Sequence, residues 1–244
     1  MANALAFDLS NLMYIGAYLL GRGIENHPTA DQQIYQSCRE MMRRYYRQFK
    51  PDKLVFACDS QSYWRRDLYP EYKGHRPFNL LKQQVRSAVA LFKAEHTHLC
   101  VEVDGFEADD VIYALSQYSE YEELTIVSSD QDFIQLIGDK VRLFEPKYRQ
   151  YRARPKKPAL DLFIKCIRGD SSDNIPSAYP YVRTKQLQAA FHDQKRFDQL
   201  LNTTLRNGQT VRERYEFNRR LIDLSQIPVE YGGLVNEAIA RFMN

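Results

Sequence analysis

The chain has 244 residues, of which 44% are hydrophobic and 27% are charged, and its formal net charge at pH 7 is +3. This composition excludes fibrous and low-complexity proteins, and the length suits one large domain or one domain with a smaller appendage. No apolar run approaches the roughly 18 residues of a membrane-spanning helix, and the first residues lack the basic segment of a secretory signal, so we expect no membrane contact. Four scattered cysteines without CxxC spacing indicate reduced thiols and a cytoplasmic protein.

Short apolar runs in the first 150 residues predict the strands of a sheet. The runs are 4–7, 54–58, 99–103, 124–127 and 141–144, with helical periodicity between most of them. Such alternation is typical of an α/β fold with a mainly parallel sheet flanked by helices. After about residue 144 only helical patterns follow, so we expect an α/β core over residues 1–157 and a helical subdomain over 158–244.

Several of these strands end at a carboxylate. Asp8 follows the first strand, Asp59 follows the second, and Asp130 and Asp132 follow the fourth. If the backbone stays extended, Asp130 and Asp132 share a face. The carboxyl ends of parallel strands meet at one edge of a sheet, where ligands usually bind. We therefore expect these acids to gather there, although a helix cap remains the alternative for Asp8 taken alone.

Three further acids open a helix after the third strand. Glu107, Asp109 and Asp110 lie in its first turn, just after Gly105. A single acid at a helix start commonly only complements the helix dipole. Three together repel one another, and a bound cation is the least costly remedy. With the strand-end acids they predict a metal site, and an all-oxygen ligand set favours Mg²⁺.

Two segments, 64–76 and 147–157, interleave basic and aromatic side chains. Such a mixture suits a nucleic acid, because cations contact phosphates and rings stack on bases. A solvated helix with extended arginines is the alternative for the first segment. That segment leads at Pro77 into a helix with Lys82 and Arg86 on its outer face. We expect residues 60–95 to form a helical arch or clamp.

The order of these motifs resembles the phage and bacterial 5′-nuclease family, the flap-endonuclease branch of the PIN-like fold, and is closest in appearance to the ribonucleases H of T-even phages. The motifs that carry the resemblance are, in chain order, Phe7-Asp8 with Asn11, Asp59, Trp64-Arg65 through Arg76, Glu107-Ala108-Asp109-Asp110, Asp130-x-Asp132 and Gly169-Asp170 through Pro176. The last of them matches the entry to a helix-three-turn-helix element that grips duplex DNA, within the helical subdomain.

The resemblance implies two or more Mg²⁺ ions, replaceable by Mn²⁺, that activate water and stabilise the leaving oxygen during phosphodiester hydrolysis. The implied metal ligands are Asp8, Asp59, Glu107, Asp109, Asp110, Asp130, Asp132, Asp170 and Asp173. The residues expected to be catalytic are Lys73, Arg76, Asp8, Asp59, Asp110 and Asp132. Nucleic-acid contacts are expected from Tyr14, Arg65, Arg66, Tyr72, Lys73, Arg76, Lys82, Arg86, Arg183 and Lys185.

The family's activity would be 5′–3′ exonuclease or flap endonuclease cleavage of branched or nicked duplex DNA, and of RNA–DNA hybrids with 5′ ends, in primer removal and flap processing during phage replication. The resemblance further implies a monomer, in the host cytoplasm for a phage-encoded chain, with a replication single-strand-binding protein as partner. Two alternatives stay open. A Toprim-like nicking enzyme would not supply Asp8 and Asp59, and a nuclease-inactive DNA-binding module would be expected to have lost acids. A dehalogenase-like phosphatase would open with Asp-x-Asp, where this chain has Asp8-Leu9-Ser10.

The chain departs from the family pattern after Pro176. The family continues with a glycine-rich hairpin, whereas residues 177–183 contain no glycine. Close approach of backbone amides to a phosphate is easiest at glycine, and Pro180 has no amide donor. We therefore expect Arg183 and Lys185 to hold duplex phosphates through their side chains.

Overall fold

The computed structural model describes residues 2–243 and divides the chain into two compact units. The first contains the chain up to Trp64, residues Pro77–Arg154 and the chain from Val229 onward, and the second contains Arg65–Arg76 and Pro155–Pro228. The division differs in two respects from the expected boundary at residues 157 and 158. The final helix belongs to the first unit, and the expected arch, 60–95, is shared between the two.

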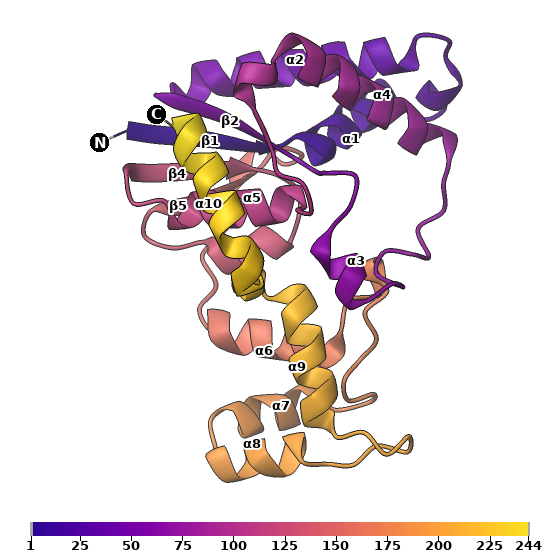
Figure 1. Ribbon diagram of the computed structural model, residues 1–244, viewed down its shortest axis with the longest axis vertical. Helices are drawn as coiled ribbons and strands as arrows, with labels where there is room; N and C mark the ends of the chain where they lie inside the picture. Colours follow the sequence, from indigo (N-terminus) through magenta and orange to yellow (C-terminus); the bar gives the residue numbers. More distant parts are fainter. Residues whose placement is uncertain (1, 244) are drawn as a thin grey trace. The chain divides into compact units, whose positions relative to one another are not determined.

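One six-stranded sheet forms the centre of the first unit (Figure 1). The strands are β1 (Ala2–Asp8), β2 (Lys53–Cys58), β3 (Cys100–Glu102), β4 (Tyr121–Val127), β5 (Val141–Glu145) and β6 (Gln150–Tyr151). Their order is β3-β2-β1-β4-β5-β6, and every pairing is parallel except that of β5 with β6. The expected α/β fold with a mainly parallel sheet is thereby confirmed.

Strand β6 was not expected, since only helices were predicted after residue 144. It forms where the chain turns back along β5, with Arg149 in the left-handed backbone region at φ 54°. Tyr151 packs its ring against Phe49 and Phe144 at centroid distances of 6.1 and 5.4 Å. A strand of two exposed residues at a sheet edge has no apolar alternation by which it could be recognised.

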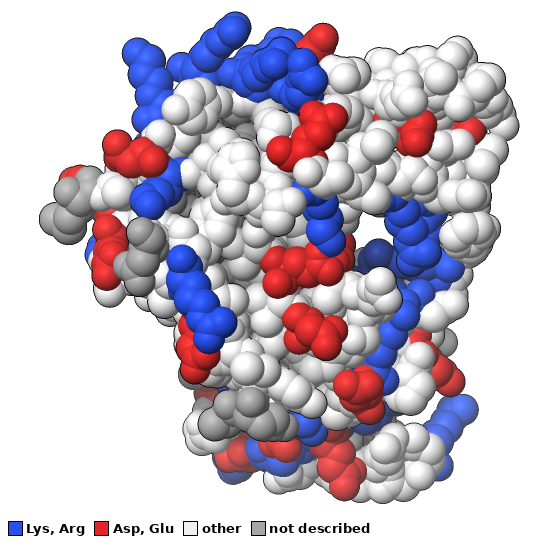
Figure 2. All heavy atoms as spheres, turned by 45° about the horizontal axis from the view of Figure 1, so that its top comes forward, with Lys and Arg blue, Asp and Glu red and all other residues white. Residues whose placement is uncertain are grey.

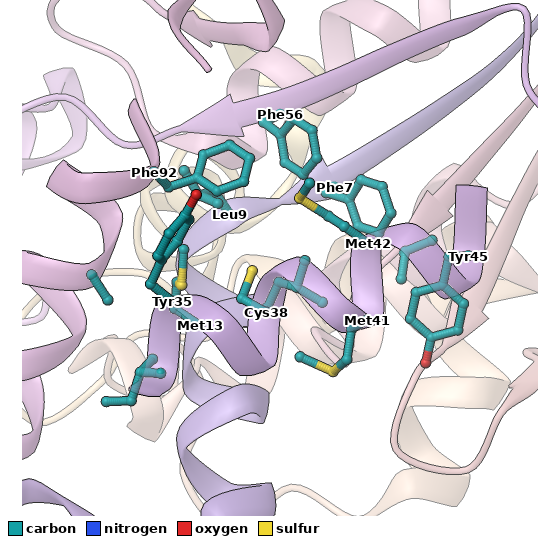
Figure 3. Close-up of a cluster of buried hydrophobic side chains, with 14 of the residues drawn as sticks. Phe7, Leu9, Met13, Tyr35, Cys38, Met41, Met42, Tyr45, Phe56 and Phe92 are labelled. Carbon is teal, nitrogen blue, oxygen red and sulfur yellow. The ribbon is translucent and has the colours of Figure 1, made fainter. Parts of the chain in front are cut away.

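Helices cover both faces of the sheet (Figure 1). On one face lie α1 (Leu9–Leu20), α2 (Ala30–Phe49) and α4 (Leu80–Glu95), and on the other lie α5 (Ala108–Gln117) and α10 (Val229–Met243). Figure 3 shows the core beneath α2, where Phe7 stacks on Phe56 at 4.9 Å between ring centroids. Fully burying side chains of this size stabilises the fold by roughly 1.5–3 kcal/mol each. This packing fixes where β1 ends, and so where Asp8 lies.

The end of the chain returns to the core because α10 has an apolar stripe. Val235 and Ile239 are buried, and the Lys53 ammonium donates to the Met243 carbonyl at 2.9 Å. No helix within residues 2–243 combines the length and apolar character needed to cross a bilayer.

The second unit is helical, with α6 (Pro158–Arg168), α7 (Thr184–Phe191), α8 (Gln194–Leu201) and α9 (Val211–Ile222). Its core is built from Leu160, Phe163, Ile167, Leu187, Leu201 and Val211. The short helix α3 (Trp64–Leu68) bridges the division between the units. The short 3-10 helix Ser171–Asp173 follows α6, with Asp170 at its N-cap and Asp173 as its last residue, the two acids expected at the entry to the DNA-gripping element.

The cysteines are free thiols, and their pKa values are shifted in different directions. A hydrogen bond with Cys58 lowers the pKa of the half-buried Cys100 thiol, whereas the same bond and burial raise the pKa of Cys58, and burial raises that of Cys38. Because the thiolate is the nucleophile, we expect iodoacetamide at about pH 7–8 to modify Cys100 first. Peptide mass mapping over time checks this, and equally fast labelling of Cys38 would contradict it.

Candidate metal centre

Three carboxylates that are distant in the sequence meet at the carboxyl edge of the sheet. One oxygen from each of Asp8, Asp109 and Asp130 lies within 4.8 Å of the others. Asp8 ends β1, Asp130 follows the neighbouring β4, and Asp109 lies in the first turn of α5. Carboxylate oxygens this close together are what a divalent cation requires, and their mutual repulsion is relieved when one binds.

Hydrogen bonds hold two of these carboxylates in place. Asp8 caps α1 by accepting from the Asn11 amide at 2.9 Å, and the Ser128 hydroxyl donates to it at 3.4 Å. The Asp130 carboxylate accepts from the Asp132 amide at 2.8 Å, and the Asp130 amide donates to the Ser128 hydroxyl at 3.1 Å. Helix capping and membership of the acid cluster thus coexist at Asp8.

Asp59 orients the elements around the cluster. One of its oxygens accepts from the Ala108 amide at 3.0 Å, at the start of α5, and the other accepts from the Ser10 hydroxyl at 2.8 Å, in the first turn of α1. Asp59 thereby links the start of α5, which contains Asp109, to the start of α1, which follows Asp8. Through these hydrogen bonds Asp59 helps to position the carboxylates of Asp8 and Asp109.

Glu107 and Asp110 form a capping box at the start of α5. Both are buried, and the Glu107 amide donates to Asp110 at 3.0 Å. The Trp64 indole N–H also donates to Asp110, at 3.2 Å. For these two acids the structure shows the local role that helix-start acids commonly have. Of the three acids in this turn, Asp109 is the one within the cluster.

Asp132 does not continue an extended strand end, as was expected. It begins a 3-10 helix, Asp132–Leu136. Because the chain coils there, the two-residue alternation that would place Asp130 and Asp132 on one face does not apply. Asp130 belongs to the cluster of three, whereas Asp132 contributes its amide to the Asp130 carboxylate.

The other two expected metal ligands lie in the second unit and are paired with cations there. Asp170 lies 3.2 Å from the Lys165 ammonium and accepts from the Ser172 amide at 2.8 Å. Burial by itself would raise the pKa of Asp170, but the Ser172 hydrogen bonds and the Lys165 charge bring it below its ordinary value. Asp173 accepts from Arg76 at 2.5 Å and lies 3.9 Å from the Lys73 ammonium.

Two residues expected to contact nucleic acid are buried instead. Arg65 is 1% exposed, and its Nε–H donates to the Leu221 carbonyl at 3.1 Å, in the last turn of α9. Tyr72 is 2% exposed, and its hydroxyl donates to Asp173 at 3.1 Å. Both side chains are held by hydrogen bonds within the second unit. The expected nucleic-acid contact of Arg65 and Tyr72 stays a prediction, and in this structure both side chains lie buried.

The remaining expected contacts lie at the surface to different degrees. Tyr14, on α1, is 41% exposed and lies less than two turns beyond Asp8. The exposed cations are Arg66, Arg76, Arg86, Arg183 and Lys185, while Lys73 and Lys82 are half-buried.

The sequence patterns did not predict the roles of three polar residues: Ser10 and Ser128 order the cluster, and Trp64 holds the neighbouring Asp110. A usable signal existed for Ser128, since a serine directly after a buried strand and two residues before an acid often hydrogen-bonds to the following backbone. For Trp64, whose ring is 3% exposed, no local signal points to Asp110.

Comparison with known proteins places the chain in a family. A family model described as the 5′-3′ exonuclease N-terminal resolvase-like domain matches residues 3–159. The chain is 32% identical over 144 residues to a 5′-3′ exonuclease of Bacillus subtilis, covering 52% of this chain and 48% of that one. It is 34% identical over 143 residues to DNA polymerase I of Rhizobium leguminosarum, covering 52% of this chain and 14% of that one. The chain thus spans half or less of these relatives.

Solved structures share the fold. Zinc-bound T5 5′-exonuclease superposes with a TM-score of 0.76 at 19% identity, covering 99% of this chain and 98% of that one. The T5 D15 flap endonuclease in complex with DNA and metal ions gives 0.72 at 18% identity, covering 99% and 98%. Since the family model matches well over half of its residues, the chain belongs to the 5′-3′ exonuclease family, through its N-terminal resolvase-like domain.

Proposed function

We propose that this protein is a divalent-metal-dependent 5′-nuclease that hydrolyses phosphodiesters of branched or nicked duplex DNA at 5′ ends, as exonuclease, flap endonuclease or both. The observation that carries the proposal is the convergence of Asp8, Asp109 and Asp130 within 4.8 Å at the carboxyl edge of the sheet. Family membership and the DNA complex of a structural neighbour support it. RNA in RNA–DNA hybrids, primer removal in phage replication, a single-strand-binding partner, a monomeric state and a cytoplasmic location belong to the same proposal.

The residues present fit a hard divalent cation. Asp8, Asp109 and Asp130 offer only oxygen donors, which favours Mg²⁺, with Mn²⁺ as substitute. When bound, two such ions would supply an activated water and a stabilised leaving oxygen. The protein's own part is orientation, since Ser128 holds Asp8 and Asp130 while Asp59 fixes the start of α5. Partners of this kind raise metal affinity by roughly 10–100-fold.

Lys73 and Arg76 are proposed to offset charge that develops on the scissile phosphate. In the structure the single carboxylate of Asp173 pairs with both, at 2.5 Å from Arg76 and 3.9 Å from Lys73. A phosphate that binds them therefore competes with Asp173 for the same cations.

Asp173→Asn should bind DNA more tightly than wild type in EDTA, because both cations become available to phosphates. The slope of log affinity against log salt should steepen by up to about 1.8, two phosphate contacts at about 0.9 each. Fluorescence anisotropy over a salt series measures this. Glu237→Gln, which removes one charge from an exposed pair with Arg241, is the matched control. An unchanged slope in Asp173→Asn would mean that Asp173 does not restrain Lys73 and Arg76.

Arg183 and Lys185 are proposed to grip duplex DNA at the start of α7. Both are exposed, and the preceding Tyr181 occupies the left-handed region at φ 65°. Arg183→Ala/Lys185→Ala should lower the salt slope of duplex binding by about 1.8, with equal wild-type affinity in Na⁺ and K⁺. K⁺-specific binding by wild type, or an unaltered slope in the variant, would show that the loop binds through its backbone and a cation instead.

One experiment tests the function itself. A 5′-labelled flap, a nicked duplex and an RNA–DNA hybrid are digested in parallel with Mg²⁺, with Mn²⁺ and with EDTA, beside a closed circular duplex. Cleavage at 5′ ends that requires metal supports the proposal. Binding without cleavage of any substrate indicates a nuclease-inactive DNA-binding module, and nicking of the closed circle indicates a Toprim-like activity.

A further inference from the structure

Besides the basic-aromatic segments, one further group of positive charge lies in the second half of α2 and its cap. Residues 39–50 contain five basic side chains, Arg39, Arg43, Arg44, Arg47 and Lys50, and one acid, Glu40. Their net charge is +4, whereas the whole chain carries +3, so the rest of the molecule is slightly acidic at −1. Neither of the basic-aromatic segments described above includes these residues.

These cations lie on the side of α2 that faces away from the sheet. The helix buries Ile34, Cys38 and Tyr45 against the core, as Figure 3 shows for the latter two. At 100° per residue, Arg43 and Arg47 fall opposite this buried stripe. Both are exposed, as is Arg44. Figure 2 shows a dense group of Lys and Arg along its upper edge, on the side where α2 lies in Figure 1.

An open hollow of about 600 Å³ runs along this face of the helix. Its lining consists of Glu40, Arg43, Arg44, Arg47 and Gln48. Every residue of this lining is charged or polar, so charge rather than an apolar side chain distinguishes the hollow. Three guanidinium groups around one open space suit an anion with several acceptor oxygens.

These arginines are not neutralised within the fold. Across residues 2–243 the structure gives Arg43, Arg44 and Arg47 no ion pair with a carboxylate, whereas the exposed Arg142 and Arg241 pair with Glu123 and Glu237. The helix dipole stabilises cations only in the last turn of a helix. Arg47 lies in the last turn of α2, whereas Arg43 does not. Like charges four residues apart, as at Arg43 and Arg47, destabilise a helix. An external polyanion would remove that cost.

We infer that this face of α2 is a second nucleic-acid contact, which binds the phosphate backbone of a duplex arm away from the bond that is cleaved. The inference rests on the proposed function, because the polyanion is then the substrate itself. Arg39, Arg43, Arg47 and Lys50 rise about 16 Å along the helix at 1.5 Å per residue, close to the rise of five base pairs at 3.4 Å each. Tyr46 is the one large exposed ring of α2, at 50%. Binding of a protein partner commonly depends on a few buried anchor side chains, whereas phosphate contacts depend mainly on charge.

The test compares two variants that each lose two positive charges. Arg43→Gln/Arg47→Gln removes the centre of the face, and Arg142→Gln/Arg241→Gln removes arginines that are already paired. Binding of a labelled flap substrate is followed by anisotropy in EDTA over a salt series. The α2 variant should lower the slope of log affinity against log salt by about 1.8, and the control should leave it unchanged. The melting temperature of the α2 variant should stay the same or rise, because like-charge repulsion is relieved.

The other outcomes have distinct meanings. Equal slopes in the α2 variant and wild type overturn the inference. Binding of poly-glutamate to both proteins is measured in the same way. If the α2 variant loses poly-glutamate binding while its salt slope for DNA is unchanged, the inference is also overturned, and the face is assigned to an acidic protein partner. The binding assay contains no divalent metal, so its result is independent of hydrolysis. Failure of wild type to cleave any substrate with Mg²⁺ would remove the proposed nuclease function and still leave the DNA contact of α2 measurable.

Discussion

Asp130→Asn is expected to slow metal-dependent cleavage of a 5′ flap by at least about 10³-fold, a barrier increase of about 4 kcal/mol. Asp130 is one of three carboxylates within 4.8 Å of one another, and an amide in its place removes a negative charge from the ligand set. Duplex binding in EDTA should change little, because the proposed phosphate contacts lie elsewhere. Single-turnover cleavage at saturating Mg²⁺ measures the loss, and Mn²⁺ titration calorimetry measures the metal affinity directly.

Two companion variants locate the effect. Asp139→Asn changes the same charge at an exposed site paired with Arg154 and should cleave like wild type. Asp110→Asn should act mainly on stability, because Asp110 is fully buried, accepts from the Trp64 indole and forms half of the cap of α5. Wild-type turnover in Asp130→Asn would show that Asp8, Asp109 and Asp130 do not act as one metal site.

Gly169→Ala is expected to destabilise the helical unit by about 3 kcal/mol or more, because backbone strain and a backbone clash act together there. Gly169 ends α6 at φ 72°, and a Cβ at this position would lie 2.3 Å from the Ile175 carbonyl oxygen. That carbonyl cannot withdraw easily, because Asp170 and Ile175 exchange two backbone hydrogen bonds, at 2.9 and 2.7 Å. Such combinations are among the few mechanisms that give large effects.

Gly208→Ala is the control that measures backbone strain alone, without a steric clash of the added Cβ. Gly208 lies in the same unit at φ 84°, but a Cβ added to it would have no neighbouring atom within 4 Å. It should lose only the roughly 1 kcal/mol that a left-handed backbone costs a residue with a Cβ. Urea unfolding followed by circular dichroism gives both values. Equal losses in the two variants would mean that the close approach of Gly169 to Ile175 costs nothing.

The sequence by itself determined the five parallel strands β1 to β5 and the acids at the ends of several of them, but not β6. Buried parallel strands are continuous apolar runs, and a carboxylate that ends such a run is visible from neighbouring residues alone. The resemblance of the ordered motifs to the 5′-nuclease family was likewise contained in the chain, and the family match confirms it. The sequence also contained an unused signal. Glu107 and Asp110 stand three residues apart, as in a capping box, which indicates a local role for both.

Only the tertiary structure decided which acids share a site and which cations are exposed. Asp8, Asp109 and Asp130 meet because β1 is paired with β4 and α5 starts beside them, and strand order is not a property of any local window. Arg65 resembles a surface cation in sequence, yet it lies buried and donates to Leu221, 156 residues away. Hydrophobic periodicity, with a repeat of two residues in a strand and three to four in a helix, shows which side of one element is buried. The pairings described here depend instead on how distant elements pack against one another. No single segment of the sequence contains that information.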